Sequence, residues 1–149
     1  MPESIPGTTV QPRLDHAGLA VRDLERAAAW YCAAFGYTRE LDLRVEAIDL
    51  DIVMLIHPEH ADRLELLHRP GGSAGPRHEN PAQAAASWGL GHLAFDVAGL
   101  DAAYRHVLDL GARPVMEPSP SPEPGVRMAY VADPEGNLVE LLDRAGRNA

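Results

Sequence analysis

One internal repeat constrains the fold of this chain more than any other feature of its sequence. The segment HAGLAVRDLERAAAWYCAAFGY, which begins at His16, aligns with HLAFDVAGLDAAYRHVLDLGAR, which begins at His92. Further along, LELL aligns with VELL and places Glu65 on Glu140. The histidines are 92 − 16 = 76 residues apart and the glutamates are 140 − 65 = 75 residues apart. The alignment of the two halves therefore contains a gap of one residue. Because each half runs from a histidine to a glutamate, the repeat predicts two copies of one structural module.

Each half is predicted to contain one helix and four strands. The alternating or apolar runs at residues 14–21 and 90–97 are typical of strands. A helical pattern follows in both halves: the first begins after Asp23, a plausible N-cap, and ends at Gly36, and the second ends before Gly111. Three further strands follow each helix, at about 38–46, 48–57 and 63–68, and at about 113–117, 126–132 and 137–143. The predicted order is therefore β-α-β-β-β, twice.

Three segments lie outside this pattern. Residues 69–89, which join the halves, and residues 117–125 are rich in Gly, Pro and Ser, and the second could form a lip over a pocket. Residues 1–12 are predicted to form a disordered tail. A chain of 149 residues suits one compact domain. We therefore expect a single domain at 13–144, with module 1 at about 13–68 and module 2 at about 90–144.

The composition argues against several classes of function. A formal charge of −9 with scattered basic residues disfavours binding to nucleic acid or to anionic lipid. No apolar run approaches the ~20 residues of a membrane-spanning helix, and the N-terminus lacks the pattern of a signal peptide. Cys32 is the only cysteine, which suits a reducing compartment. We expect a cytoplasmic protein that does not bind nucleic acid.

Strand alternation places the repeated histidines and glutamates on one side of the predicted sheets. His16 shares its face with Gly18 and Ala20, and His92 shares its face with Ala94 and Asp96. The opposite face of each first strand is apolar and is expected to pack on the helices. In the last strand, Glu140 lies between apolar neighbours on its own face. The four side chains are therefore expected on the concave side, away from the helices.

A metal ion would explain why carboxylates recur at such positions. A buried, unpaired carboxylate is costly unless a cation or hydrogen-bond donors compensate it. Two imidazoles and two carboxylates suit Zn²⁺, Fe²⁺, Ni²⁺, Co²⁺ or Mn²⁺, and leave positions for water or substrate. A single His or Glu on a strand is more often solvated or paired within ordinary structure, but the spacings here match, 65 − 16 = 49 and 140 − 92 = 48. The sequence therefore predicts one divalent metal held by His16, Glu65, His92 and Glu140.

Other polar and aromatic residues receive no role from the sequence. Five histidines have no counterpart in the repeat and are expected at the surface or in loops: His57, His60, His68, His78 and His106. Four more residues could line a cavity, although a strand Tyr or Trp is more often part of the core: Trp88, Tyr130, Arg127 and Glu117.

The segments LDHAGLAVRDLERAAAWY, LELL, LGHLAFDVAGLDAAYRHVLDLGA and DPEGNLVELLD resemble the vicinal oxygen chelate superfamily over about residues 13–144. This superfamily includes glyoxalase I, methylmalonyl-CoA epimerase, extradiol dioxygenases and the fosfomycin and bleomycin resistance proteins. The resemblance implies an α+β fold in which two tandem βαβββ modules form a cup-shaped, barrel-like mixed β-sheet with the helices outside. It also implies that His16 and His92 are first-strand metal ligands and that Glu65 and Glu140 are last-strand ligands. Both closure of the cup within one chain and closure across a homodimer occur in the superfamily.

The residue at position 65 helps to discriminate among the branches. Extradiol dioxygenases resemble this chain at its other three ligand positions, but they keep a three-ligand iron site, from which Glu65 departs. Methylmalonyl-CoA epimerases generally have Gln there, although their opening DHxGxAV and longer linking loop resemble this chain. Bacterial glyoxalase I matches all four ligands, yet usually has an Arg soon after the first histidine, where this chain has Ala17 to Ala20. Resistance proteins that only sequester a drug lack the metal set.

The resemblance to the glyoxalase and epimerase branches implies proton transfer next to a carbonyl group through a metal-stabilised enolate. We therefore predict a divalent-metal-dependent isomerase, epimerase or lyase that acts on a small oxygen-rich carbonyl metabolite. Glu140 is predicted to act as the base, with Glu65 as the equal alternative. An Fe²⁺-dependent dioxygenase is the second possibility, and a small-molecule binding or antibiotic resistance protein is the third.

Overall fold

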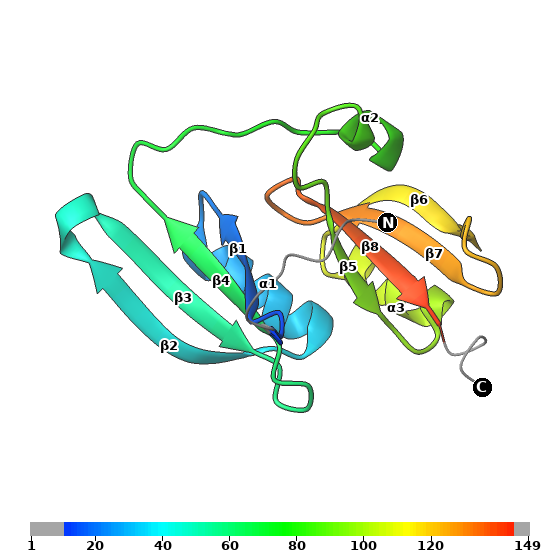
Figure 1. Cartoon of the computed structure of the whole chain (residues 1–149), viewed down its shortest axis with the longest axis horizontal. Coiled ribbons are helices and arrows are strands. Elements are labelled where there is room, and N and C mark those ends of the chain that lie inside the picture. Colours follow the sequence, from blue (N-terminus) through cyan, green and yellow to red (C-terminus); the bar gives the residue numbers. More distant parts are fainter. Residues whose placement is uncertain (1–10, 145–149) are drawn as a thin grey trace, which may run out of the picture.

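The computed structural model describes residues 11–144 of the chain and contains the two predicted modules. Figure 1 shows their sheets side by side, with the two long helices behind them. The first module consists of β1 (His16–Ala20), α1 (Leu24–Phe35), β2 (Thr38–Val45), a short 3₁₀ turn (Glu46–Ile48), β3 (Leu50–Ile56) and β4 (Arg63–His68). The linker carries α2 (Pro81–Ala85). The second module consists of β5 (Leu93–Asp96), α3 (Leu100–Asp109), β6 (Arg113–Pro120), β7 (Arg127–Ala132) and β8 (Leu138–Asp143).

The two sheets have the same topology, β1-β4-β3-β2 and β5-β8-β7-β6. In each sheet the first strand pairs with the last strand in parallel, and the other pairs are antiparallel. Helix α1 packs on β2, β3 and β4, and α3 packs on β6, β7 and β8, so each sheet has one covered face and one open face. This confirms the predicted α+β fold of two βαβββ modules with outer helices. The sheets stay two four-stranded sheets and do not close into a barrel.

The ends of the helices follow from the residues that the sequence singled out. The carboxylate of Asp23 accepts a hydrogen bond from the N–H of Arg26 at 3.0 Å and caps α1. Gly36 ends the helix in the left-handed region, at φ 77°, and its N–H donates to the carbonyl of Cys32. Gly111 follows the end of α3 at φ 94°. Both predicted helix ends therefore lie where glycine's freedom is needed.

One core joins the two modules. The buried side chains of α1, β3 and β4 belong to the same cluster as those of α3, β7 and β8. Phe35 at the end of α1 stacks on Phe95 of β5, with 4.0 Å between the ring centroids. The Tyr31 hydroxyl donates to the Asp133 carboxylate at 2.6 Å, which ties α1 to the turn before β8. These contacts hold the two sheets in one arrangement relative to each other.

Two connections differ from their prediction. Residues 118–120, which were expected in the connection after the strand, extend β6, because Ser119 and Pro120 still pair with β7 after a shift in register. Strand β6 is an edge strand, where the missing N–H of proline costs no hydrogen bond within the sheet. The linker was expected to be irregular, yet Asn80 caps the short helix α2 by accepting from the N–H of Gln83. The predicted tail at 1–12 lies outside the described residues except for its last two positions.

None of the helices within residues 11–144 is long and apolar enough to cross a membrane.

Candidate metal centre

The first His–Glu pair lies on the open face of the first sheet. His16 begins β1, Glu65 lies in the parallel neighbour β4, and His16 Nε2 is 3.9 Å from Glu65 Oε1. Gly18 is the register partner of Glu65, and a Cβ atom there would lie 3.8 Å from the Glu65 carboxylate. Leu64 and Leu66 point to the core on the other face. The predicted ligands of the first module therefore meet on the face that the helix leaves uncovered.

Asp15 orients the first histidine. Its carboxylate accepts a hydrogen bond from His16 Nδ1 at 2.7 Å, which leaves Nε2 facing Glu65. This hydrogen bond is the main cause of the raised pKa of His16, to which the charge of Glu65 adds. The same bond lowers the pKa of Asp15. A carboxylate behind the outer ring nitrogen is the usual support of a metal-ligating histidine, because it fixes the ring and its tautomer.

The second pair is closer and more deeply covered. His92 directly precedes β5, and its Nε2 lies 3.0 Å from Glu140 Oε2 in β8. The Glu140 side chain is 13% exposed, compared with 23% for Glu65. Ala94 stands opposite Glu140 in the parallel register, where the first module has Gly18 opposite Glu65. The two pairs thus occupy equivalent places in the repeat, as the sequence predicted.

Tyr130 belongs to the second pair. It stands opposite Glu140 in the antiparallel register of β7 and β8, and its hydroxyl lies 3.4 Å from His92 Nε2. Burial raises the pKa of the Tyr130 hydroxyl, and the Glu140 carboxylate adds to that shift, so the hydroxyl stays protonated at neutral pH. In the first module Met54 takes the equivalent place opposite Glu65. The signal that could have identified Tyr130 was the DPEGN turn, which sets the register of this hairpin.

The open face of the first sheet is apolar around the His16–Glu65 pair. Leu41 is the register partner of Met54, which in turn pairs with Glu65, so all three lie on this face. Along β2 the side chains of Leu41, Leu43 and Val45 are 42%, 49% and 39% exposed. Large apolar side chains gathered on one exposed face commonly mark a binding surface.

The four predicted ligands do not converge within a single chain. His16 and Glu65 lie in the first sheet, whereas His92 and Glu140 belong to the second. Among residues 11–144, no three His, Cys, Asp or Glu side chains lie close enough together to hold one metal ion. The structure therefore presents two half-sites, and a common metal centre stays a prediction.

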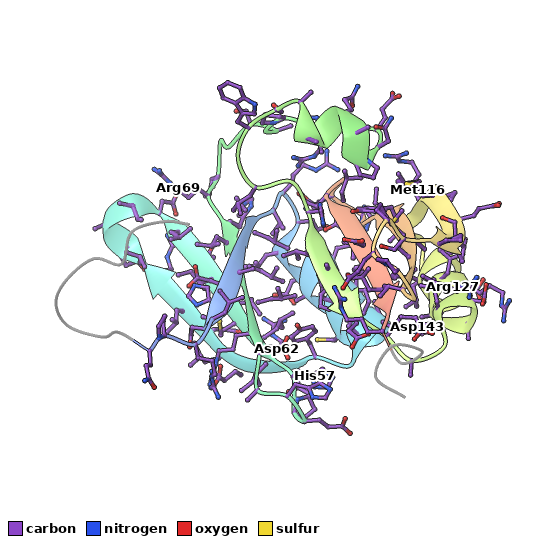
Figure 2. The ribbon with its side chains drawn as sticks, turned by 45° about the vertical axis from the view of Figure 1, so that its right-hand side comes forward. His57, Asp62, Arg69, Met116, Arg127 and Asp143 are labelled. Atoms are coloured by element: carbon purple, nitrogen blue, oxygen red, sulfur yellow. The ribbon has the colours of Figure 1, made fainter. Side chains whose placement is uncertain are left out.

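Residues that the sequence left without a role lie mostly away from the two pairs. Figure 2 shows His57 beside Asp62 at the turn between β3 and β4, where the His57 ring accepts hydrogen bonds from backbone N–H groups of the turn. Arg127 pairs with Asp101 of α3 at 2.8 Å. Trp88 is 97% exposed in the linker and lines a shallow pocket that His92 also lines. Of the four side chains named as possible cavity residues, Tyr130 is the one that contacts a half-site.

The sequence model of the glyoxalase/bleomycin resistance protein/dioxygenase superfamily matches residues 13–141. The chain belongs to this superfamily. This confirms the resemblance to glyoxalase-type and dioxygenase-type proteins that the repeat motifs carried. The superfamily includes glyoxalase I lyases and extradiol dioxygenases, so membership by itself does not determine the reaction.

Two relatives within the superfamily are named for different reactions. Biphenyl-2,3-diol 1,2-dioxygenase 3 of Rhodococcus globerulus is 31% identical over 134 residues, which cover 89% of this chain and 64% of that protein. The chain thus spans less than two thirds of the dioxygenase. A probable lactoylglutathione lyase of Synechocystis is 25% identical over 134 residues, covering 89% of this chain and 95% of that protein.

Solved structures of the superfamily share the fold. A glyoxalase family protein from Bacillus cereus superposes with a TM-score of 0.72 at 22% identity, over 94% of this chain and 98% of that one. A glyoxalase I variant from Zea mays superposes with a TM-score of 0.70 at 24% identity, over 89% of this chain and 44% of that one. At these identities the likeness establishes the paired-module fold alone.

Proposed function

We propose that this protein is a divalent-metal-dependent isomerase, epimerase or lyase that moves a proton next to the carbonyl group of a small metabolite. The observation that carries the proposal is the pair of matched half-sites, each with one histidine and one glutamate on an open sheet face. Membership of the superfamily and the lactoylglutathione lyase relative support it. A cytoplasmic location stays a prediction.

The residues present fit a divalent cation. Glu140 is largely covered, and its ion-pair partner is His92, whose charge depends on its protonation state. A carboxylate in such a place is stabilised by a cation. His16 has its outer nitrogen held by Asp15 and presents the other one toward Glu65. We propose that His16, Glu65, His92 and Glu140 are the ligands of one Ni, Co, Zn, Fe or Mn ion, since a mixed set of nitrogen and oxygen donors suits these metals.

We propose that the two half-sites meet across a homodimer. The common core and the Phe35–Phe95 stack fix the two sheets, so closing them on each other within one chain would disrupt that packing. A two-fold axis would instead bring the first half-site of each copy against the second half-site of the other, giving two complete sites. The exposed apolar face along β2 supports this association, because a second copy would cover it.

The side chains of the proposed centre have different roles in the proposed reaction. When bound, the metal would act as a Lewis acid that stabilises negative charge on an enolate oxygen. Glu140 takes the substrate proton in this proposal, with Glu65 as the alternative base. Tyr130, which stays protonated beside Glu140, donates a hydrogen bond to a substrate oxygen, so one half-site holds both a proton acceptor and a donor. Asp15 positions His16 and does not contact the substrate.

An Fe²⁺-dependent dioxygenase is the second candidate, and the 31% identical dioxygenase relative favours it. Glu65 disfavours it, because the resemblance to extradiol dioxygenases implies a site with three protein ligands. A binding or resistance protein is the third candidate. Oxygen consumption with catechols and Fe²⁺ would support the dioxygenase, whereas exchange of substrate protons into D₂O without oxygen use would support the proposed reaction. Tight binding without turnover would support the third.

Metal analysis of the purified chain tests the ligand set. We expect His16→Ala and Glu140→Gln to lose most of the bound metal that wild type retains. His60→Ala is the matched control, because His60 is an exposed turn residue outside both pairs. Equal metal content in all four proteins would contradict the proposed centre.

Mixing two inactive variants tests the dimer. His16→Ala and His92→Ala should each lack both sites, yet a heterodimer of the two contains one site with all four ligands and one with neither histidine. After equilibration, metal binding and activity should recover to about a quarter of the wild-type level, because half of the dimers are mixed and each has one intact site. A site built within one chain would recover nothing on mixing.

A further inference from the structure

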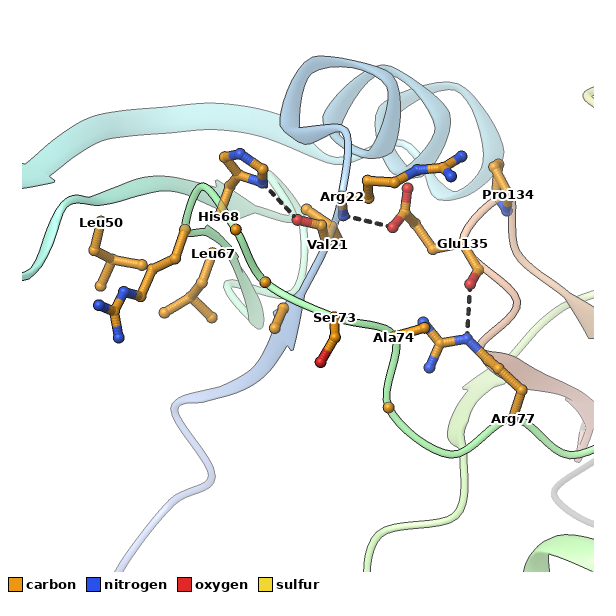
Figure 3. A pocket seen from close by; sticks show the side chains of 15 residues that line it. Val21, Arg22, Leu50, Leu67, His68, Ser73, Ala74, Arg77, Pro134 and Glu135 are labelled. Carbon is orange, nitrogen blue, oxygen red and sulfur yellow. Dashed lines mark hydrogen bonds between the residues drawn. The ribbon is translucent and has the colours of Figure 1, made fainter.

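A pocket of about 880 Å³ lies where β1 and β4 end and the linker crosses them. Its apolar side chains include Leu50 and Leu67, and the small residues 71–75 of the linker form one wall. Figure 3 shows Leu67 and His68 on one side of it, Arg77 with Glu135 on the other, and Ser73 on the linker between them. Three arginines line it: Arg22, Arg69 and Arg77. In a chain whose formal charge is −9, this gathering of cations is a local exception.

The three arginines have no carboxylate partner within residues 11–144, whereas five other arginines of the described chain do. Arg77 donates to backbone carbonyls, at 2.9 Å to that of Glu135 and at 3.3 Å to that of Pro76. The Glu135 carboxylate is engaged elsewhere, because it accepts from the backbone N–H groups of Arg22 at 2.6 Å and Asp23 at 3.4 Å. The arginines that do form ion pairs are Arg39, Arg44, Arg63, Arg127 and Arg144.

The internal repeat supplies a comparison for Arg69. Its counterpart in the second module is Arg144, since 144 − 69 = 75 is the offset of the last strands. The Arg144 guanidinium lies 2.7 Å from both carboxylate oxygens of Glu123, which comes from the β6–β7 connection. In the second module, the arginine at this position therefore has a carboxylate partner, Glu123.

The equivalent connection of the first module also carries acidic residues, but these form ion pairs with a different arginine. Glu46, Asp49 and Asp51, at or beside the turn between β2 and β3, all pair with Arg44, at 2.9, 2.6 and 3.0 Å. Arg69 therefore has no carboxylate partner equivalent to the one that Glu123 provides for Arg144. Guanidinium groups that line one pocket without a carboxylate bound to them favour an anionic ligand, because each can donate two hydrogen bonds to a phosphate or a carboxylate.

We propose that this pocket binds an organic anion, whose phosphate or carboxylate group is attracted by the positive charge of Arg22, Arg69 and Arg77 and whose apolar body lies on Leu50 and Leu67. The small residues of the linker let such a group approach the backbone closely. The volume of the pocket is within the range of small-molecule sites.

The pocket continues the open face that carries the first half-site. Leu67 is two residues beyond Glu65 on β4, and Ala20 is four residues beyond His16 on β1. At roughly 3.3 Å per residue, these steps are about 7 and 13 Å. One molecule can therefore span both places. This link rests on the proposed function: if that holds, the substrate is a carbonyl compound with an acid group roughly 10 Å from the reacting carbon.

Calorimetric titration of the 149-residue chain tests the pocket, with phenyl phosphate, benzoate and neutral benzyl alcohol as probes. Each titration is made with the purified protein and repeated after chelator treatment, so that a probe bound to a metal is recognised. We expect one or both anions to bind, more weakly as salt is raised, and the alcohol not to bind. Arg22→Gln and Arg69→Gln should each weaken anion binding roughly tenfold or more. Arg105→Gln, which removes an exposed charge on α3 outside the pocket, should leave it unchanged.

The comparison of the two anions identifies the preferred acid group. Unchanged affinity in both pocket variants, equal binding of the alcohol, or no binding of either anion by wild type would overturn the proposal. Failure of the proposed function is distinct from these outcomes, because it would appear as unchanged metal content in His16→Ala while anion binding still depends on Arg22 and Arg69.

Discussion

The hydrogen bond between Tyr31 and Asp133 gives a quantitative test of how the modules are joined. Tyr31 is fully buried, Asp133 is 4% exposed, and 2.6 Å separates the hydroxyl from the carboxylate. The same carboxylate accepts from the N–H groups of Glu135 and Asn137 and from the Asn137 side chain. It therefore organises the turn before β8, the strand that carries Glu140. Burial and the nearby Asp133 charge raise the pKa of Tyr31, so its hydroxyl remains a donor throughout the physiological range.

Tyr31→Phe removes this donor without opening a cavity. A hydrogen bond to a charged group contributes about 1.5–3 kcal/mol, and the carboxylate left behind is too covered for water to replace the lost bond easily. We expect a loss of about 2 kcal/mol in the free energy of unfolding, which corresponds to a fall of about 6 °C in Tm for a chain of this length. Urea unfolding followed by circular dichroism measures the loss. Protein concentration must be held constant, because dimerisation would add to the apparent stability.

Tyr104→Phe is the matched control. Tyr104 is also buried, at 8% exposure, and its hydroxyl has no hydrogen bond like that of Tyr31 in the described structure. We expect this variant to change stability by less than about 0.5 kcal/mol. If the two variants lost the same amount, the contact between α1 and the β8 turn would not be the source of the stability that we assign to it.

Three further perturbations test other parts of the structure. Gly36→Ala should cost about 1 kcal/mol in urea unfolding because Gly36 has φ 77°, whereas Gly18→Ala should be nearly neutral because a Cβ fits there at ordinary contact distances; equal costs would contradict this. Arg127 lowers the pKa of Asp101, so Arg127→Gln should raise that pKa toward 3.8. An NMR titration of Asp101 measures this change. The accompanying loss of stability should be present at neutral pH and vanish as the pH falls through the pKa of Asp101; a pH-independent loss would refute it. Tyr130→Phe should lower turnover at least tenfold with metal content retained, and unchanged turnover would remove Tyr130 from the mechanism.

Much of the module structure was predictable because its signals are local. Helix α1 begins after Asp23 and ends at Gly36 as expected, since one side-chain cap and one left-handed glycine determine those ends. The equivalence of His16 with His92 and of Glu65 with Glu140 also followed from the repeat, because β1 and β4 occupy the same places in their module as β5 and β8. The extension of β6 through Pro120 was not predicted, because only the pairing with β7 shows that Pro120 lies in an edge strand.

The sequence by itself determined the two modules, the order of their elements along the chain and the equivalent positions of the histidines and glutamates. Periodicity and helix caps act over a few residues, and the repeat shows the same pattern twice. The sequence did not determine how the halves face each other. That depends on which side chains pack between them, such as Phe35 on Phe95 and Tyr31 on Asp133, and these contacts join residues far apart in the chain. Only the tertiary structure showed that the four predicted ligands form two separate pairs in one chain. The core shared by the two modules holds the two sheets in positions at which these pairs do not meet.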